Sequence, residues 1–139
     1  GSMTSTHSGH PIGAAAALAS IELILRENLV ENARVMGERL FVGLKKIHAR
    51  HAVQFDLQGR GLVCALMAIK DRKTMEPDAD LAFDIILHAF EAGLLMFAPV
   101  GRGGGCVKIA PPLCITADAI DEGLEVLSQV VDDAVGRMK

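Results

Sequence analysis

The chain has 139 residues, a length that suits one domain, and 50% of them are hydrophobic. Its formal net charge of −3 and its aromatic content of 4%, with no Trp or Tyr, argue against a nucleic-acid-binding protein. No apolar run is long enough to span a bilayer, so we expect no membrane segment and infer that the surplus apolar surface contacts another domain or subunit.

The first expected element is a helix that begins at Pro11, because the fixed φ of proline suits the first helical position. Its apolar residues Leu18, Ile21 and Leu25 follow helical spacing. A second helix is expected to begin at Asn28, which forms a capping-box pattern with Glu31, and to run to about residue 50. Its apolar stripe consists of Val30, Ala33, Gly37, Leu40, Leu44 and Ile47.

Strands are expected in the middle of the chain. Residues 53–57 alternate between apolar and polar, and residues 62–69 form a more apolar run after a turn or bulge at Gly59 and Gly61. Residues 70–77 are expected to form a polar loop. A third helix should begin at Asp78 or Asp80 and stop at Gly93. Its inward side chains would be Leu81, Ala82, Ile85, Ile86, Ala89 and Phe90.

The last part of the chain predicts a short strand over 94–97, a flexible tip over 101–105 and a strand over 106–109. Thr116 is expected to cap the final helix, whose stripe is Ile120, Leu124, Leu127, Val131 and Val135. This order predicts an α/β (α+β) two-layer sandwich, in which helices cover a small mixed, largely antiparallel sheet.

Several ordered segments resemble the motifs of one known family. Residues 6–19 are similar to a T-x-x-G-[NSH]-P-x-x-x-A-A-A-x-A segment, and residues 28–33 to an E-N-L-x-E-N-A stretch. Residues 59–62 match a G-x-G-L turn, and residues 107–116 resemble a V-[RK]-x-x-P-P-L-x-I-T run. With Asp-Glu-Gly-Leu at 121–124 opening the final helix, the chain resembles the class III (omega-type) aminotransferases, which have these motifs in this order.

The resemblance implies a pyridoxal-phosphate enzyme of fold type I that moves an amino group from an ω-amino acid or amine donor to a 2-oxo acid. It identifies residues 4–139 as the C-terminal small domain, and residues 1–3 resemble a tag remnant. The Schiff-base lysine and the acidic partner of the pyridine nitrogen would lie upstream of Thr6. We therefore expect no catalytic residue in this chain, an inactive isolated fragment and a homodimeric parent.

Thr6 is the first candidate for cofactor binding. Hydroxyl groups and free backbone N–H groups at the start of a helix suit a dianionic phosphate. By the resemblance, the Thr6 hydroxyl contacts the cofactor phosphate of the neighbouring subunit, and Ser5 is its companion by adjacency. The alternative for this segment is ordinary helix capping.

Lys108 is the candidate for substrate binding. Some family members have an arginine at the matching position that pairs with the substrate carboxylate, whereas lysine is a point charge without the bidentate fork. Lys108 alternates with Val107 and Ile109 on a short strand and could face a cleft. The alternative is that its side chain extends outward into solvent.

The remaining polar residues and the cysteines are not assigned to a binding site. Arg60 and Arg102 are interpreted as exposed loop arginines, and no set of ligands completes a metal site around the paired histidines at 7 and 10 or at 48 and 51. The odd number of cysteines in apolar surroundings predicts reduced thiols and a cytoplasmic protein. Two rival hypotheses stay open: a standalone dimerising interaction module, and another class III activity such as a racemase, aminomutase or decarboxylase.

Overall fold

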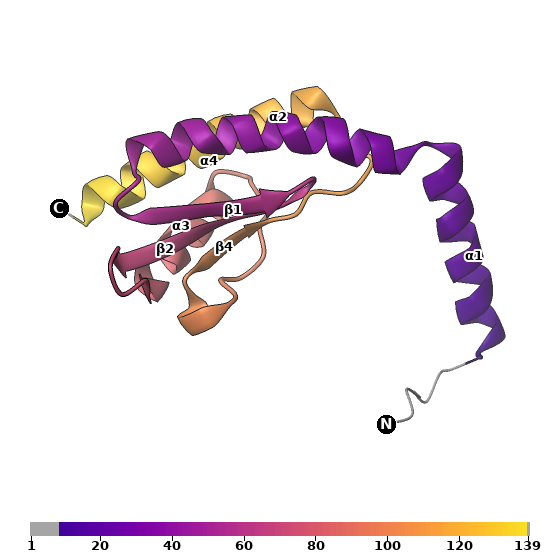
Figure 1. Ribbon diagram of the computed structural model, residues 1–139, viewed down its shortest axis with the longest axis horizontal. Coiled ribbons are helices and arrows are strands. Elements are labelled where there is room, and N and C mark those ends of the chain that lie inside the picture. Colours follow the sequence, from indigo (N-terminus) through magenta and orange to yellow (C-terminus); the bar gives the residue numbers. More distant parts are fainter. Residues whose placement is uncertain (1–8, 139) are drawn as a thin grey trace.

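The computed structural model describes residues 9–138, so the candidates Ser5 and Thr6 lie outside the described residues. Figure 1 shows a small sheet covered by long helices, with one helix projecting from this body. The helices and strands are α1 (Pro11–Arg26), α2 (Leu29–Arg50), β1 (Phe55–Arg60), β2 (Val63–Asp71), β3 (Glu76–Pro77), α3 (Ala79–Glu91), a short 3-10 helix (Arg102–Gly104), β4 (Cys106–Ile109) and α4 (Ala117–Arg137). The predicted two-layer architecture of α and β elements is confirmed.

Strand β2 is the centre of the sheet. Strand β1 pairs along one side of it and β4 along the other, while the two-residue β3 pairs with its end, and each of these pairings is antiparallel. The register places Leu57, Leu66 and Val107 in one row across the sheet and Gln58, Ala65 and Lys108 in the next. Because successive side chains of a strand point to opposite faces, these two rows lie on opposite faces.

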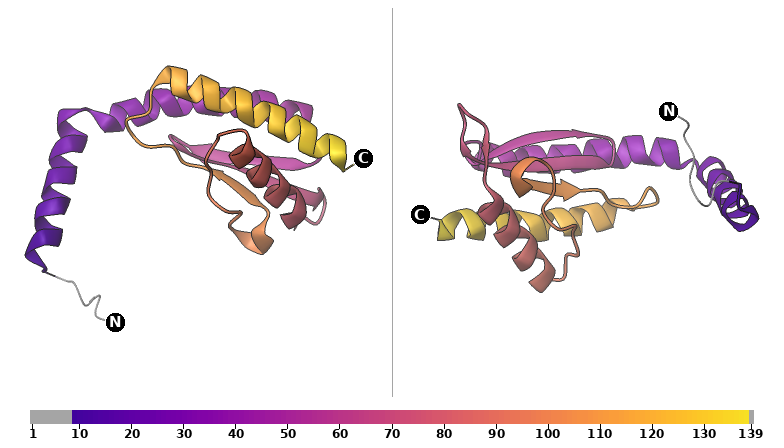
Figure 2. Two further views of the ribbon diagram at one scale, coloured as in Figure 1. Left: turned by 180° about the vertical axis from the view of Figure 1, so that it is seen from behind. Right: turned by 90° about the horizontal axis from the view of Figure 1, so that it is seen from below.

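Among residues 9–138, helices cover only one face of the sheet (Figure 2). On β2, Cys64, Leu66 and Ala68 are buried, whereas the intervening Val63 is exposed and Ala65 is half-buried. Helices α2, α3 and α4 pack on the buried face, and α4 contacts both α2 and α3 (Figure 2). The core is built from buried residues of all three helices and of the sheet, among them Leu44, Phe55, Leu66, Leu81, Ile85, Val107 and Val131.

Two helix starts follow the predicted capping chemistry. The side chain of Asp78 accepts a hydrogen bond from the backbone N–H of Leu81, and that of Thr116 accepts one from Ala119. Each bond satisfies a backbone donor that the first turn of a helix would otherwise leave unpaired. Helix α3 nevertheless differs at its end from the prediction, because Phe90 is 64% exposed rather than inward.

The capping box predicted at Asn28 is wrong. Asn28 is the N-cap of α2, but it has a left-handed φ of 50° and its side chain makes no capping hydrogen bond. Glu31 pairs with Arg34 instead, at 2.7 Å. The left-handed residue redirects the chain between α1 and α2, and asparagine tolerates this conformation better than most residues.

The short strand predicted over 94–97 is also absent. Residues 94–99 lie outside every helix and strand, and a single bridge joins Val100 to Cys106. The side chains of this segment nevertheless alternate in burial: Leu94 and Met96 pack against the core, while Leu95 and Phe97 are exposed. Alternation shows which side chains face the core, but a strand also needs a neighbour with which to pair.

Helix α1 forms as predicted from Pro11, yet it buries none of its residues. Leu18, Ile21 and Leu25 are all more than half exposed, at 58%, 55% and 72%. Within residues 9–138, no helix is long and apolar enough to cross a membrane.

Candidate functional site

Lys108 lies on β4, in the row that faces away from the helices. Its cross-strand neighbour is Ala65, and Gln58 of β1 is the next residue along the same row. The lysine is half-buried, and its Nζ lies 4.8 Å from the centroid of the Phe97 ring. A cation over the face of an aromatic ring is attracted by the negative face of the ring.

No carboxylate neutralises this lysine within residues 9–138. The contacts found for Lys108 are the ring of Phe97 and an electrostatic effect on Cys106. The amide of Gln58 is turned toward Asp56, to which it donates a hydrogen bond at 3.0 Å. The ammonium group is therefore available to an anion that approaches the uncovered face of the sheet.

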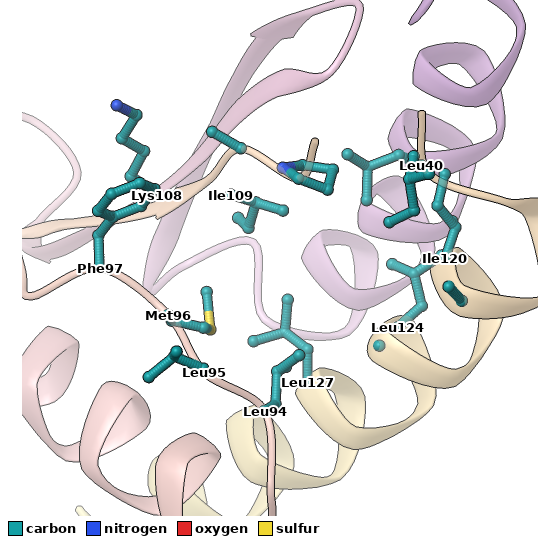
Figure 3. A pocket seen from close by; sticks show the side chains of 15 residues that line it. Leu40, Leu94, Leu95, Met96, Phe97, Lys108, Ile109, Ile120, Leu124 and Leu127 are labelled. Atoms are coloured by element: carbon teal, nitrogen blue, oxygen red, sulfur yellow. The ribbon is translucent and has the colours of Figure 1, made fainter. Parts of the chain in front are cut away.

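An apolar cavity of about 140 Å³ adjoins Lys108 and Phe97. Figure 3 shows leucine and isoleucine side chains gathered in it, while the amino group of Lys108 points away from them. Besides Phe97 and Lys108, its lining includes Leu94, Met96, Ile109, Ile120, Leu124 and Leu127. The chain of Lys108 thus adjoins the apolar cavity, while its ammonium group points away from the cavity on the open side of the sheet (Figure 3).

The cysteines near the sheet do not act as reactive thiolates. Burial raises the pKa of Cys64, and burial also raises that of Cys106, although the charge of Lys108 partly opposes this. A raised pKa keeps a thiol protonated at neutral pH, and the protonated form is a poor nucleophile. Cys64, Cys106 and Cys114 are all free of disulfides.

The histidines of α2 serve contacts within the fold. The Nε2 atom of His48 lies 3.1 Å from the carbonyl oxygen of Phe55, and that of His51 lies 2.5 Å from a carboxylate oxygen of Asp132. Across the part of the chain that the structure describes, no group of His, Cys, Asp and Glu side chains could hold a metal ion.

Two other arginines that the sequence singled out lie in exposed positions. Arg60 is an exposed residue at the end of β1, and Arg102 is exposed in the short 3-10 helix. Figure 1 places the N-terminal end of α1 away from the sheet. Sequence reasoning missed the role of Phe97, which was assigned only to the short strand expected over residues 94–97.

Comparison with known proteins supplies the context for this site. The sequence profile described as Aminotransferase class-III matches residues 1–131. The chain is 38% identical to the taurine–pyruvate aminotransferase of Bilophila wadsworthia over 85% of its own length and 27% of that protein. It is 32% identical to the 5-aminovalerate aminotransferase of Pseudomonas aeruginosa over 96% of its length and 31% of that enzyme. It is 33% identical to the alanine/serine racemase of Pyrococcus horikoshii over 97% of its length and 28% of that enzyme.

Comparison with solved structures also finds transaminases. A transaminase from the marine bacterium Virgibacillus superposes with a TM-score of 0.84 at 30% identity, covering 99% of this chain and 32% of that one. The omega transaminase from Pseudomonas jessenii in complex with PMP superposes with a TM-score of 0.80 at 28% identity, covering 96% of this chain and 29% of that one. The chain thus spans less than a third of the proteins that it matches.

Proposed function

The chain belongs to the class III aminotransferase family, and from this membership we propose that it is the C-terminal small domain, residues 4–139, of a longer pyridoxal-phosphate-dependent transaminase. Residues 1–3 would be a tag remnant. The parent exchanges the amino group of a donor for the carbonyl oxygen of a 2-oxo acid, so that the donor becomes the carbonyl compound. We further propose that the parent is a cytoplasmic homodimer, in keeping with the three free cysteines and the exposed apolar face of α1.

The described residues do not provide the reactive centre of such an enzyme. Every lysine among residues 9–138 is exposed or half-buried, and we assign the Schiff-base role to none of them. We assign that lysine, and the acidic partner of the pyridine nitrogen, to the part of the parent outside this chain. When bound, pyridoxal phosphate supplies the electron sink for transamination.

We propose that the phosphate of this cofactor binds near the start of α1. The first turn of α1 carries no acidic residue, so no nearby carboxylate in that turn opposes an anion at the helix start. Thr6 and Ser5 precede this helix in the sequence and would add hydroxyl donors. We propose that Thr6, with Ser5 beside it, binds the phosphate of the adjacent subunit.

The observation that carries the substrate assignment is the ammonium group of Lys108, which has no acidic partner within residues 9–138 and stands beside an apolar cavity. We propose that it binds the carboxylate of the substrate. Two of the relatives are named for taurine and 5-aminovalerate, each of which has an amine at one end and an anion at the other. A donor of this type fits the site, since one cation can orient its anionic end.

The test is a comparison of donors with the full-length parent enzyme. Lys108→Met should raise the KM of an ω-amino acid by about ten-fold, with little change for a neutral amine that has no anion to bind. Equal effects on both donors would remove Lys108 from the substrate site. Thr6→Ala should weaken cofactor binding, and an unchanged affinity for pyridoxal phosphate would remove Thr6 from its site.

Racemisation is the second candidate, favoured by the similarity to the alanine/serine racemase. The two activities differ in their products. Transamination turns the donor into a carbonyl compound, whereas racemisation returns the same amino acid with inverted configuration. Chiral chromatography of the products from the full-length enzyme, with and without a 2-oxo acid, separates them.

A further inference from the structure

Helix α3 carries apolar side chains on two sides. One side is buried in the core through Leu81 and Ile85. The opposite side carries Phe83, Leu87 and Phe90, whose exposed fractions are 59%, 43% and 64%. Their spacing of i, i+4 and i+7 places these three residues in one continuous stripe, the α3 stripe. A helix that is apolar on both sides is typical of one that protein covers on both sides.

The other large apolar surface of this chain does not reach the α3 stripe. Both views in Figure 2 place α3 far from the projecting α1, so the apolar face of α1 lies elsewhere on the molecule. The two surfaces also differ in their charged surroundings. Helix α1 has no acidic residue in its first turn, whereas α3 has Asp80, Asp84 and Glu91 and contains no lysine or arginine.

An acidic groove lies beside the stripe, between α3 and α4. Its volume is about 730 Å³, and its acidic lining residues are Glu91, Glu125 and Asp133. The single cationic residue of α4 is Arg137, which pairs with Asp84 at 2.7 Å. The ring of His88 approaches Glu91 only to 3.9 Å. The groove therefore has a surplus of negative charge that the described residues do not neutralise.

Glu91 joins the stripe to the groove, because it lies one turn after Leu87 on α3 and lines the groove. Apolar anchors bordered by carboxylates complement an amphipathic helix that has lysine or arginine along one edge of its apolar face. We propose that the α3 stripe and the acidic groove together bind such a helix of a partner protein. The apolar side chains supply most of the affinity, and the carboxylates select a basic partner.

The charge of this surface argues against two other occupants. A second copy that paired its own α3 with this one would bring further carboxylates and no lysine or arginine. An anionic membrane surface would likewise be repelled by the carboxylates of the groove.

The probe is a synthetic peptide of about 18 residues, with leucines at helical spacing and lysines along one edge of the leucine stripe. One control peptide has glutamate in place of each lysine, and the other has the composition of the probe without helical spacing. Fluorescence anisotropy of the labelled peptides, titrated with the 139-residue chain, measures the dissociation constants. The lysine peptide should bind about ten-fold more tightly than either control.

Substitutions locate the binding surface. Phe90→Ser should weaken binding of the lysine peptide by about ten-fold, because it removes an apolar anchor. Leu18→Ser in α1 is the matched control, since Leu18 is 58% exposed, and it should leave binding unchanged. Glu91→Lys combined with Glu125→Lys should reverse the preference, so that the glutamate peptide binds about five-fold more tightly than the lysine peptide. Circular dichroism shows whether each variant is folded.

Several results would overturn the proposal. Equal affinities for the three peptides would remove the selection by charge, and unchanged binding in Phe90→Ser would remove the stripe. Dimerisation of the chain that Phe90→Ser abolishes in size-exclusion chromatography would assign the stripe to a second copy. A full-length parent that does not bind the lysine peptide, and that Phe90→Ser destabilises, would assign the stripe to the upstream part of the parent.

Discussion

Helices α1 and α2 follow each other along the chain and are both regular, but they differ in what they contribute to the fold. Helix α2 buries Gly37, Leu40, Leu44 and Ile47, whereas α1 buries no residue over its whole length. Both helices have apolar residues at helical spacing. The difference shows that amphipathic spacing predicts which face of a helix is apolar, but not whether the same domain supplies the surface that covers it.

The outward faces of the two helices differ as well. Helix α2 carries charged residues on its exposed side, where Arg34 pairs with Glu31 and Glu38, and Arg39 pairs with Asp121 of α4. Most of α1 consists of alanine and aliphatic residues, and its single described ion pair joins Arg26 to Glu27 at its end. The surface of α2 is suited to water, while that of α1 is suited to another protein surface.

Truncating one apolar side chain in each helix tests this difference most strongly. Leu44 of α2 is fully buried, so Leu44→Ala should lower the free energy of unfolding by about 3 kcal/mol through lost burial and a cavity. Leu18→Ala in α1, the matched variant, should change it by less than about 0.5 kcal/mol, because the side chain is 58% exposed. Urea denaturation of the 139-residue chain measures both, and similar losses would mean that α1 is packed in solution.

Glycines in the same two helices provide a second contrast. A Cβ atom at Gly37 of α2 would lie 2.4 Å from the carbonyl carbon of Gly61, so Gly37→Ala should destabilise the chain by about 2 kcal/mol. A Cβ atom at Gly13 of α1 would have no neighbour within 4 Å, so Gly13→Ala should be neutral or stabilise by about 0.5 kcal/mol. A loss of stability in Gly13→Ala would show that the α1 surface is in contact with something.

The smallest expected change in stability comes from lowering the pH. It concerns Asp132, which pairs with residues at the end of α2 farthest from α1. Burial opposes ionisation of Asp132, but hydrogen bonds from His51 and Arg50 outweigh it and hold the pKa of this carboxyl below its ordinary 3.8. A lowered pKa stabilises the fold above pH 3.8, and this stabilisation is lost as the pH falls through the lowered value.

The Asp132 side chain is 40% exposed, so solvent screening limits the loss to less than about 1 kcal/mol. Denaturation at pH 7 and at pH 3 should show a smaller difference between the two pH values in Asp132→Asn than in the unsubstituted chain. An equal loss of unfolding free energy between pH 7 and pH 3 in the two proteins would contradict the role of this ion pair in joining α2 to α4.

Local sequence signals correctly predicted the elements whose caps and buried partners lie within this chain. Asp78 and Thr116 cap their helices, and the stripe of α4 is buried at Ile120, Leu127, Val131 and Val135, as the spacing indicates. The capping box at Asn28 failed because the turn between α1 and α2 requires a left-handed residue, and tertiary geometry overrides a local motif. The strand expected at 94–97 failed because pairing depends on a neighbour that a single segment does not reveal.

The sequence likewise predicted one part of the candidate site and missed another. Lys108 was predicted from its strand and from the family motif, and the structure places it on the uncovered face of the sheet. Its contact with Phe97 joins residues 11 positions apart across a hairpin, which no periodicity indicates. Thr6 and Ser5 lie outside the described residues, so their roles stay predictions.

The neighbours Val107 and Lys108 on β4 have a consequence for how this protein can evolve. One side chain is fully buried among the helices, and the next stands on the opposite, open side. Mutations of Val107 should therefore change mainly the stability of the fold, whereas mutations of Lys108 should change mainly ligand binding. A lineage that exchanges lysine for another residue at 108 can explore new chemistry for its substrates without rebuilding the interior that supports the strand.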